Sequence, residues 1–307
     1  MAFFISWVLA AAAVAAQEDA LERARMLAES GRTAEAIEFL ESYTRHSPRP
    51  AELVYLAQLQ AEAGGLPQAA VSLSRALDRA PDQEGLRVTL GAMLFELRQY
   101  EDAKRELELV LERRSSSALA HYYLAAVEKG LSDLDRAERS AERAVELLPP
   151  AGPAPLDSSE PAPAAAARHL LAEIRFELGK EVEPLLREVL AIEPGHASAH
   201  YLLARYLSRS GRSEEAEAEL LLFSRMKRAE AHLSQGRDLA RIGRTEEAIA
   251  EMRLAVEARP DDPRSLFFLG RELLRTGARS EALALLERAV ALRPDAKAEV
   301  EKLLSSR

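Results

Sequence analysis

Three pairs of arginine residues in the second half of the chain could together grip a carboxylate-bearing ligand. On a helix, side chains spaced four residues apart lie on one face. Guanidinium groups hold carboxylates through paired hydrogen bonds. Tyr201 and Phe267 each precede the first arginine of a pair by four residues and would place an apolar strip beside the charges. The pairs are Arg205 and Arg209, Arg237 and Arg241, and Arg271 and Arg275.

Histidine offers a second possible chemistry, which is metal binding. His196 and His200 stand four residues apart, a spacing that suits two ligands on one helix. Pro194 and Gly195 precede His196, however, and place it at or before the start of a helix. No carboxylate or cysteine is in phase with the two histidines. We therefore favour a packing role for them and predict no metal site.

No segment carries a set of residues that would support catalysis. The sequence lacks a phosphate-binding loop, a G-x-S-x-G turn and an H-E-x-x-H motif. Acidic pairs such as Glu214 with Glu215 fall where helices are expected to begin, and the helix dipole favours negative charge there. We therefore expect neither enzymatic activity nor a cofactor.

The composition favours a helical protein and excludes several other classes. Apolar residues make up 48% and aromatic residues only 5% of the chain, and alanine and leucine dominate. These are strong helix formers, and no window alternates for long with the period of a strand. The absence of cysteine excludes disulfides, thiolate catalysis and cysteine-based zinc sites. The net charge of −9 argues against a general nucleic-acid-binding protein.

The N-terminal residues have the form of an export signal. An apolar run extends from Ala2 to Ala16, and it ends in the small-x-small sequence Val14-Ala15-Ala16. The run is too short to span a bilayer comfortably, although no lysine or arginine precedes it. We predict a signal peptide over residues 1–16 and a mature chain that is exported to the periplasm or another extracytoplasmic space, with no transmembrane span. The alternatives are a misassigned start of the chain or a frayed N-terminal helix, and a protein without the signal would be cytoplasmic.

A short phrase returns along the chain with a period near 34 residues. Its anchor is an alanine, at Ala36, Ala69, Ala103, Ala137, Ala216, Ala248 and Ala282. Five residues before each anchor stands a turn residue: Gly31, Gly64, Arg98, Ser132, Gly211, Gly243 and Gly277. Twelve residues after it stands a proline in most copies (Pro48, Pro81, Pro149, Pro260 and Pro294), with Ser115 and Arg228 in the other two. A repeat of this length dictates the fold.

Each copy is predicted to form two antiparallel helices. A left-handed turn residue ends the first helix, and proline closes the second. A small residue stands seven positions before the turn and allows the two backbones to approach: Ala24, Ala57, Gly91, Ala125, Ala204, Gly236 and Gly270. One helix pair cannot bury its apolar face alone, but stacked pairs can.

This pattern resembles the tetratricopeptide repeat family. The period, the two small residues, the turn residue and the final proline carry the resemblance, and eight units cover residues 17–296. The resemblance implies an all-α fold, an α-solenoid of about eight helix-turn-helix units that forms a superhelix with a concave groove. The family's large aromatic residue early in the first helix is missing, and its place is taken by Ala20, Leu53, Arg87, His121, His200, His232 and Leu266.

The resemblance also implies where a ligand would bind, because the first helix of each unit lines the groove in this family. The arginine pairs occupy positions 9 and 13 of the first helix in the last three complete units, and Tyr201 and Phe267 occupy position 5. The first four units have no such series and carry Arg25 and Glu29, Gln58 and Glu62, Ala92 and Glu96, and Ala126 and Gly130. The alternative is that the arginines form only a solvated face.

An insertion divides the repeats into two blocks. The step from Ala137 to the next anchor, Val182, is 45 residues. We therefore predict a first block of four repeats over residues 17–149, a proline- and alanine-rich linker over residues 150–163, and a second block of four repeats with a capping helix over residues 164–307. The sequence "PPAGPAPLDSSEPAP" favours extended geometry, so we expect the linker to be exposed and sensitive to proteases.

These features together predict a non-catalytic scaffold or adaptor that binds a partner protein or peptide in its groove. The basic character of the arginine pairs favours a partner with an acidic or carboxylate-bearing segment. The main alternative is a structural component of an envelope or secretion complex, and a weaker one is an uncharacterised enzyme.

Overall fold

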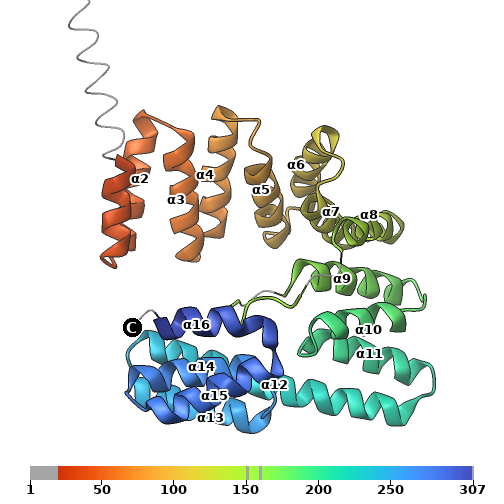
Figure 1. The fold of residues 1–307 in the computed structure, drawn as a ribbon. Helices are drawn as coiled ribbons and strands as arrows, with labels where there is room; N and C mark the ends of the chain where they lie inside the picture. The colour runs from red at the N-terminus through yellow and green to blue at the C-terminus, as the bar shows by residue number, and fades with distance from the viewer. Residues whose placement is uncertain (1–19, 150–151, 159–160, 306–307) are drawn as a thin grey trace, which may run out of the picture. The chain divides into compact units, whose positions relative to one another are not determined.

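Antiparallel helix pairs build both halves of the chain in a computed structural model that describes residues 20–149, 152–158 and 161–305 (Figure 1). No β-strand occurs in these described ranges, and the all-α prediction is confirmed. The chain divides between Ala144 and Val145 into two compact units, here called unit 1 and unit 2. The predicted signal peptide over residues 1–16 lies outside the described residues.

Unit 1 follows the predicted repeat closely. Residues 20–29 are helical, and their partner is α2. Further helices then alternate as first and second members of the following repeats, ending with α8 at the border of the unit. They are α2 (Thr33–His46), α3 (Pro50–Glu62), α4 (Leu66–Arg79), α5 (Glu84–Glu96), α6 (Tyr100–Arg113), α7 (Ala118–Gly130) and α8 (Leu134–Leu147).

The turn inside each repeat depends on one residue in the left-handed region. All seven predicted turn residues have positive φ, between 58° and 84°. At the first turn, the Gly31 N–H donates to the Ala28 carbonyl and the Arg32 N–H donates to the Leu27 carbonyl, each over 2.9 Å. These bonds satisfy carbonyl groups that the end of a helix would otherwise leave free. The predicted turn positions are confirmed.

The small residue of the first helix makes room for a large side chain of the second. A Cβ atom at Gly91 would lie only 2.7 Å from Cγ of Leu107, and one at Gly270 would lie 2.9 Å from Cγ of Leu286. Both leucines are buried. Because protein interiors are close-packed, a larger residue at either glycine would force the helices apart. The predicted role of the small residue is confirmed.

Unit 2 contains the remaining repeats and a cap. Pro184 stands in the first turn of α10, and the final segment forms the expected capping helix after a short 3-10 turn. The elements are α9 (Pro163–Glu177), α10 (Glu183–Ile192), α11 (Ala197–Arg209), α12 (Ser213–Arg241), α13 (Thr245–Ala258), α14 (Pro263–Arg275), α15 (Arg279–Leu292), η1 (Pro294–Ala296) and α16 (Lys297–Ser305).

Helix α12 departs from the predicted repeat because it is one continuous helix of 29 residues. We expected two helices here with a break near Arg228, and this expectation is wrong. Most other repeats carry proline at this place, whereas the local sequence "RMKRAEAH" contains neither proline nor glycine. Nothing therefore interrupts the hydrogen bonds of the helix. Figure 1 shows α12 running without a break from α11 to α13.

The segment between α8 and α9 folds onto unit 2 and is not an exposed linker. We call its described residues, 152–158 and 161–162, the strap. Leu156 is fully buried, and it packs in one apolar cluster with residues such as Phe267 and Val300. It is the only large aliphatic residue of the strap. Burying it removes apolar surface from water.

Side chains of α16 and of the residues just after α10 and α15 also bind the backbone of the strap. The Ala154 and Ala162 N–H groups donate to the Glu193 carboxylate, over 3.2 and 2.7 Å. The Leu156 N–H donates to Glu299 over 2.8 Å, and Arg293 donates to the Ala154 carbonyl over 2.7 Å. Because Leu156 is buried and these backbone groups are paired, the strap is not exposed along its whole length, as the sequence suggested. Its sensitivity to proteases stays a prediction.

Candidate functional site

Four of the six predicted arginines line one cavity in unit 2. The cavity has a volume of about 580 Å³ and lies between α12 and α14. Helix α12 contributes Arg237 and Arg241, one turn apart, and α14 contributes Arg271 and Arg275 in the same way. The lining is completed by Ser234, Asp238, Ala240 and Glu272.

One aromatic ring positions two of these arginines. The guanidinium carbons of Arg237 and Arg271 lie 4.7 and 4.6 Å from the ring centroid of Phe268. Phe268 is only 1% exposed, so the core fixes its ring. Cation–π stacking restrains the two guanidinium groups while leaving N–H edges able to bind a ligand.

The cavity lining keeps a positive balance of charge. Glu272 accepts a hydrogen bond from Arg275 over 2.6 Å and lies 3.5 Å from Arg271. Asp238 lies 3.5 Å from Arg241. Four arginines minus two carboxylates leave a formal charge of +2 on the lining. Within the described part of the chain, Arg237 has no ion pair, and the ring of Phe268 is its neighbour. The cavity is therefore suited to an anionic group.

The third predicted pair lies apart from this cavity. Arg205 and Arg209 stack on the ring of Phe176 in α9, at 4.8 and 3.9 Å from its centroid. Tyr201 is 42% exposed, and its ring centroid lies 5.1 Å from that of Phe223 in α12. The three arginine pairs therefore form two clusters, each organised by a buried phenylalanine, and not one continuous ladder.

Phe267 does not take the place that we predicted for it. The residue is only 5% exposed and belongs to the apolar core of unit 2. Its ring packs edge-on against Phe268, with 5.7 Å between the centroids. The expectation of a surface strip that includes Phe267 is wrong, because this side chain helps to support the ring on which the arginines stack. Phe268 itself was missed, since nothing in the repeat pattern distinguishes the two phenylalanines.

A cavity in unit 1 offers a contrast. It has a volume of about 420 Å³, and Arg45 and Arg75 are its only basic lining residues, with Glu41 beside them. Arg75 donates to the Thr44 carbonyl over 2.8 Å, and Arg45 donates to the Glu41 carbonyl over 3.3 Å. Both arginines therefore serve the local structure, and the cavity lacks a buried ring that would hold them for a ligand.

Comparison with known families identifies the repeats. Models of the tetratricopeptide repeat match residues 88–155 and 225–297, and a further such model matches residues 179–237. Together these matches cover more than half of the chain. The chain belongs to the tetratricopeptide repeat family. No curated protein is similar enough to this sequence to count as a relative.

A solved structure that matches nearly the whole chain shows the same fold. A tetratricopeptide repeat protein from Parabacteroides merdae is 16% identical, with a TM-score of 0.51, and the match covers 94% of this chain and 97% of the other. MamA from Desulfovibrio magneticus RS-1 is 19% identical, with a TM-score of 0.48, over 58% of this chain and 96% of MamA. YrrB, a TPR protein with an unusual peptide-binding site, is 16% identical, with a TM-score of 0.37, over 74% and 94%.

In two repeats of this tetratricopeptide repeat protein, a histidine–glutamate pair stands where the family usually has an aromatic residue in the first helix. His200 Nδ1 lies 2.5 Å from a carboxylate oxygen of Glu219, and His232 Nδ1 lies 2.8 Å from one of Glu251. In both pairs the acid stands 19 residues later, on the second helix of the same repeat. The histidines thus join the two helices of their repeats. No group of three or more potential metal ligands occurs among the residues that the structure describes.

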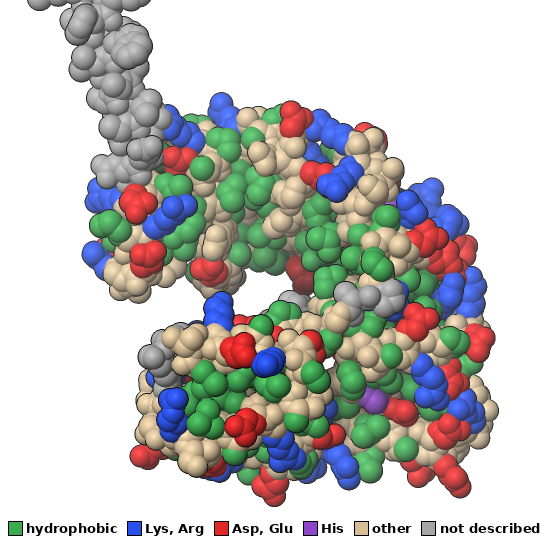
Figure 2. All heavy atoms as spheres, in the orientation of Figure 1, with side chains coloured by type: hydrophobic (Ala, Val, Ile, Leu, Met, Phe, Trp, Pro, Cys, Tyr) green, Lys and Arg blue, Asp and Glu red, His purple; other side chains and the backbone are tan. Residues whose placement is uncertain are grey.

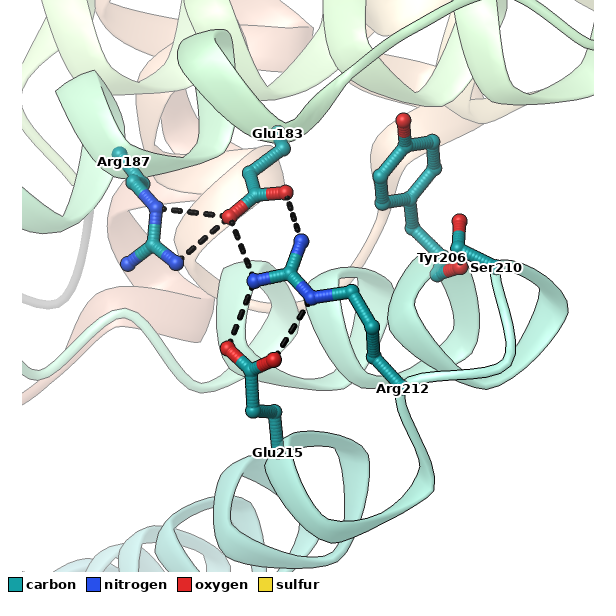
Figure 3. A network of polar contacts seen from close by, with 6 residues as sticks. All are labelled: Glu183, Arg187, Tyr206, Ser210, Arg212 and Glu215. Carbon is teal, nitrogen blue, oxygen red and sulfur yellow. Dashed lines mark hydrogen bonds and ion pairs between the residues drawn. The ribbon is translucent and has the colours of Figure 1, made fainter.

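A network of charges also connects two successive repeats of unit 2. Arg212, at the turn before α12, binds both Glu215 and Glu183 (Figure 3). Arg187, which lies on α10 together with Glu183, also binds Glu183. Hydrogen bonds from Arg212 and Arg187 lower the pKa of the Glu183 carboxyl. Sequence reasoning missed this network, since Glu183 and Arg212 stand 29 residues apart and follow no short motif.

One histidine of unit 2 is held neutral. Burial lowers the pKa of His196 to about 4, and the neighbouring His169, whose ring centroid lies 4.7 Å away, acts in the same direction. His196 precedes α11, and its Nδ1 accepts a hydrogen bond from the Ala199 N–H over 3.2 Å. A proton on Nδ1 would remove this acceptor, so the neutral form caps the helix.

The surface of the molecule carries both signs of charge. Figure 2 shows acidic and basic side chains interspersed over the face in view, with apolar side chains between them. Among the described residues, no helix combines the length and apolar composition needed to cross a membrane. The cavity between α12 and α14 differs from this mixed surface, because four arginines and two carboxylates line it and leave a positive balance.

Proposed function

We propose that this tetratricopeptide repeat protein is a non-catalytic scaffold that binds an acidic or carboxylate-bearing segment of a partner protein at the arginine cavity of unit 2. The observation that carries the proposal is the stacking of Arg237 and Arg271 on one buried ring, Phe268. A guanidinium that is already held in place loses little freedom when a ligand binds.

The expected affinity follows from the exposure of the site. An exposed ion pair contributes only about 0.2–1 kcal/mol, so one arginine alone should matter little. Several arginines acting together, beside the apolar parts of a peptide, could reach micromolar affinity, which corresponds to about 8 kcal/mol. Binding should weaken with added salt, because the screening length falls to about 8 Å at physiological ionic strength.

Two clusters of arginine permit a graded test. We would measure the binding of a labelled peptide that ends in several aspartates and glutamates, by fluorescence anisotropy at low and high salt. The double change Arg237→Glu with Arg271→Glu should abolish binding at the cavity. Adding Arg205→Glu then reports whether the cluster on Phe176 contributes.

A matched control changes the same charge elsewhere. Arg79 and Arg139 are exposed arginines of unit 1, so Arg79→Glu with Arg139→Glu alters the net charge equally and should leave binding unchanged. Circular dichroism checks that each variant is folded. If the folded cavity variant binds the peptide as tightly as the unchanged protein, the arginines form only a solvated face and the proposal fails.

Export remains a separate proposal, and it rests on the apolar run from Ala2 to Ala16 and its small-x-small end. N-terminal sequencing of the protein from its native cell decides it. A mature chain that begins at Gln17 in the extracytoplasmic fraction supports export, and one that begins at Met1 in the cytoplasm contradicts it.

A further inference from the structure

One apolar position of the repeat is exposed in α12 although it is buried in every other repeat. It is the fourth residue after the anchor of the second helix. In α12 this residue is Leu220, and 43% of it is exposed. Its equivalents are at most 2% exposed, and they are Leu40, Leu73, Leu107, Ala141, Leu186, Met252 and Leu286.

The continuity of α12 explains this exposure. In the other repeats the chain turns after the second helix, so the next first helix can pack back against it. In α12 the chain continues straight on, and the residues that would form that next helix extend away along the same axis. Leu221 and Leu222, 52% and 39% exposed, enlarge the uncovered surface. Position 221 is unusual, because the equivalent residues of α13 and α15 are Arg253 and Glu287.

The charges around Leu221 follow a symmetric order. Glu214 and Glu217 stand seven and four residues before it, and Arg225 and Arg228 stand four and seven residues after it. Steps of three and four residues keep all five side chains on one face of a helix. All five are exposed, and no ion pair joins these four charged residues to another described residue. We call this surface the α12 face.

We propose that the α12 face binds the same face of a second copy of this protein, with the two helices antiparallel about a twofold axis at Leu221. Rotation by half a turn then brings Glu217 opposite Arg225 of the partner subunit, and Glu214 opposite Arg228 of the partner subunit. Leu221 meets the partner subunit's Leu221 at the centre. Such an interface uses the same patch on both copies, as twofold dimers require.

The order of the charges selects a second copy in antiparallel orientation. A parallel pair would place acid against acid and arginine against arginine, which is unfavourable. Helix α13 provides an internal comparison, because its equivalent positions carry Glu246, Ile249, Arg253 and Glu257 and lack this symmetry. Arg228 belongs to the face only because α12 continues through the place where most repeats have proline.

Sedimentation velocity of the full chain over a concentration series provides the first measurement. We expect a monomer–dimer equilibrium that shifts toward monomer as salt is raised, since the pairs at the rim are exposed. Leu221→Ser should weaken dimerisation at least about tenfold. Leu254→Ser in α13, a leucine that is 41% exposed, is the matched control and should have no effect. A monomer at concentrations up to about 1 mM, where even weak interfaces associate, overturns the proposal.

Charge reversal tests the geometry itself. Glu217→Arg alone and Arg225→Glu alone should each weaken dimerisation about tenfold or more, because each places like charges opposite one another at two symmetric sites. An equimolar mixture of these two variants should associate again, since every arginine then faces a glutamate. Glu246→Arg on α13 is the control and should leave dimerisation unchanged. If the mixture stays monomeric while both variants are folded, the antiparallel arrangement is wrong.

Discussion

The two units differ in how one repeat is joined to the next. In unit 1 each second helix ends in a short turn, and the next first helix packs beside it, so the apolar faces of α4 and α6 are covered. In unit 2 the continuous helix α12 connects two repeats. The strap leads into the first repeat of the unit and binds α16 at the other end of the unit. Where a short turn connects two repeats, their apolar faces are buried against each other. The continuous helix α12 instead leaves an apolar surface exposed, and the strap makes contacts between residues far apart in the sequence.

The sequence indicates this difference at one position of the first helix. The residue just before the small residue of the first helix is leucine in six repeats, and these leucines are at most 6% exposed: Leu56, Leu90, Leu124, Leu171, Leu203 and Leu269. The exceptions are Arg23 in the first repeat, which has no repeat before it among the described residues, and Gln235 in α12. Both are exposed. A polar residue therefore occupies this position where no second helix of a preceding repeat packs against the first helix.

The largest effect is expected where the strap enters the core of unit 2. Leu156→Ala removes a fully buried side chain, and it should lower the free energy of unfolding by about 2–5 kcal/mol. Urea denaturation measures the loss, and hydrogen exchange should place it in the strap and α16. Val71→Ala in unit 1 is the control, because Val71 is 60% exposed. An unchanged stability would mean that residues 152–158 are the exposed linker that the sequence suggested.

A second test concerns the continuity of α12. Arg228→Pro places a proline in the interior of this helix, where it should cost about 3 kcal/mol and reduce the helical signal in circular dichroism. Arg228→Ala removes the same charge without breaking the helix and should be nearly neutral. If the proline variant is as stable as the alanine variant, the chain turns near residue 228 as it does in the other repeats, and the α12 face does not form.

The fold could be predicted largely because its determinants are local. The turn glycines and the small residues act within one helix pair, so they repeat with the period and are visible in the sequence. The errors fall where a contact is long-range or where a signal is missing. Leu156 shares an apolar cluster with Val300, more than 140 residues away, and nothing near the strap in sequence indicates that cluster. The break expected near Arg228 followed the repeat period, although the proline that enforces such a break is absent.

The candidate site was predicted in part for the same reason. The arginine spacing of four indicated a shared face, and four of the six arginines do line one cavity. The stacking on Phe176 and Phe268 depends on which ring turns inward, and this is set by packing between helices. Arg205 and Arg209 lie on α11 and stack on α9, whereas the other pairs lie on the second half of the long helix α12 and on α14.

The cap of α11 gives unit 2 a dependence on pH. Five first- and second-helix starts of unit 1, those of α2 to α6, have no side-chain cap, whereas His196 caps α11. The pKa of His196 is lowered from 6.5 to about 4, so the unfolded chain binds the proton more tightly than the folded one. The contribution of His196 to the free energy of unfolding is therefore fully present above pH 6.5. It is lost as the pH falls from 6.5 to 4, and the loss is about 3 kcal/mol at most.

His196→Asn isolates this contribution, because asparagine is a good N-cap that does not titrate. Thermal unfolding of both proteins at pH 7 and pH 4.5 provides the comparison, and the loss on acidification should be smaller in the variant. An equal loss in both proteins would assign the pH dependence to other groups, such as the carboxylates that bind arginine.

The smallest effect is expected at Gln235, and a substitution there tests most directly whether α12 is continuous. If α12 is continuous, no second helix lies beside Gln235, and Gln235→Leu places an exposed leucine on the surface. Its effect on the free energy of unfolding should then stay within about 0.5 kcal/mol. Leu269→Gln makes the reverse change at the equivalent position of α14, where the leucine is 2% exposed. There the loss of apolar burial and the buried amide should together cost about 2–4 kcal/mol. If Gln235→Leu instead stabilises the protein by more than about 1 kcal/mol, the added leucine has found an apolar partner in a regular joint. Loss of the dimer in the same variant would then identify that partner as the surface around Leu220.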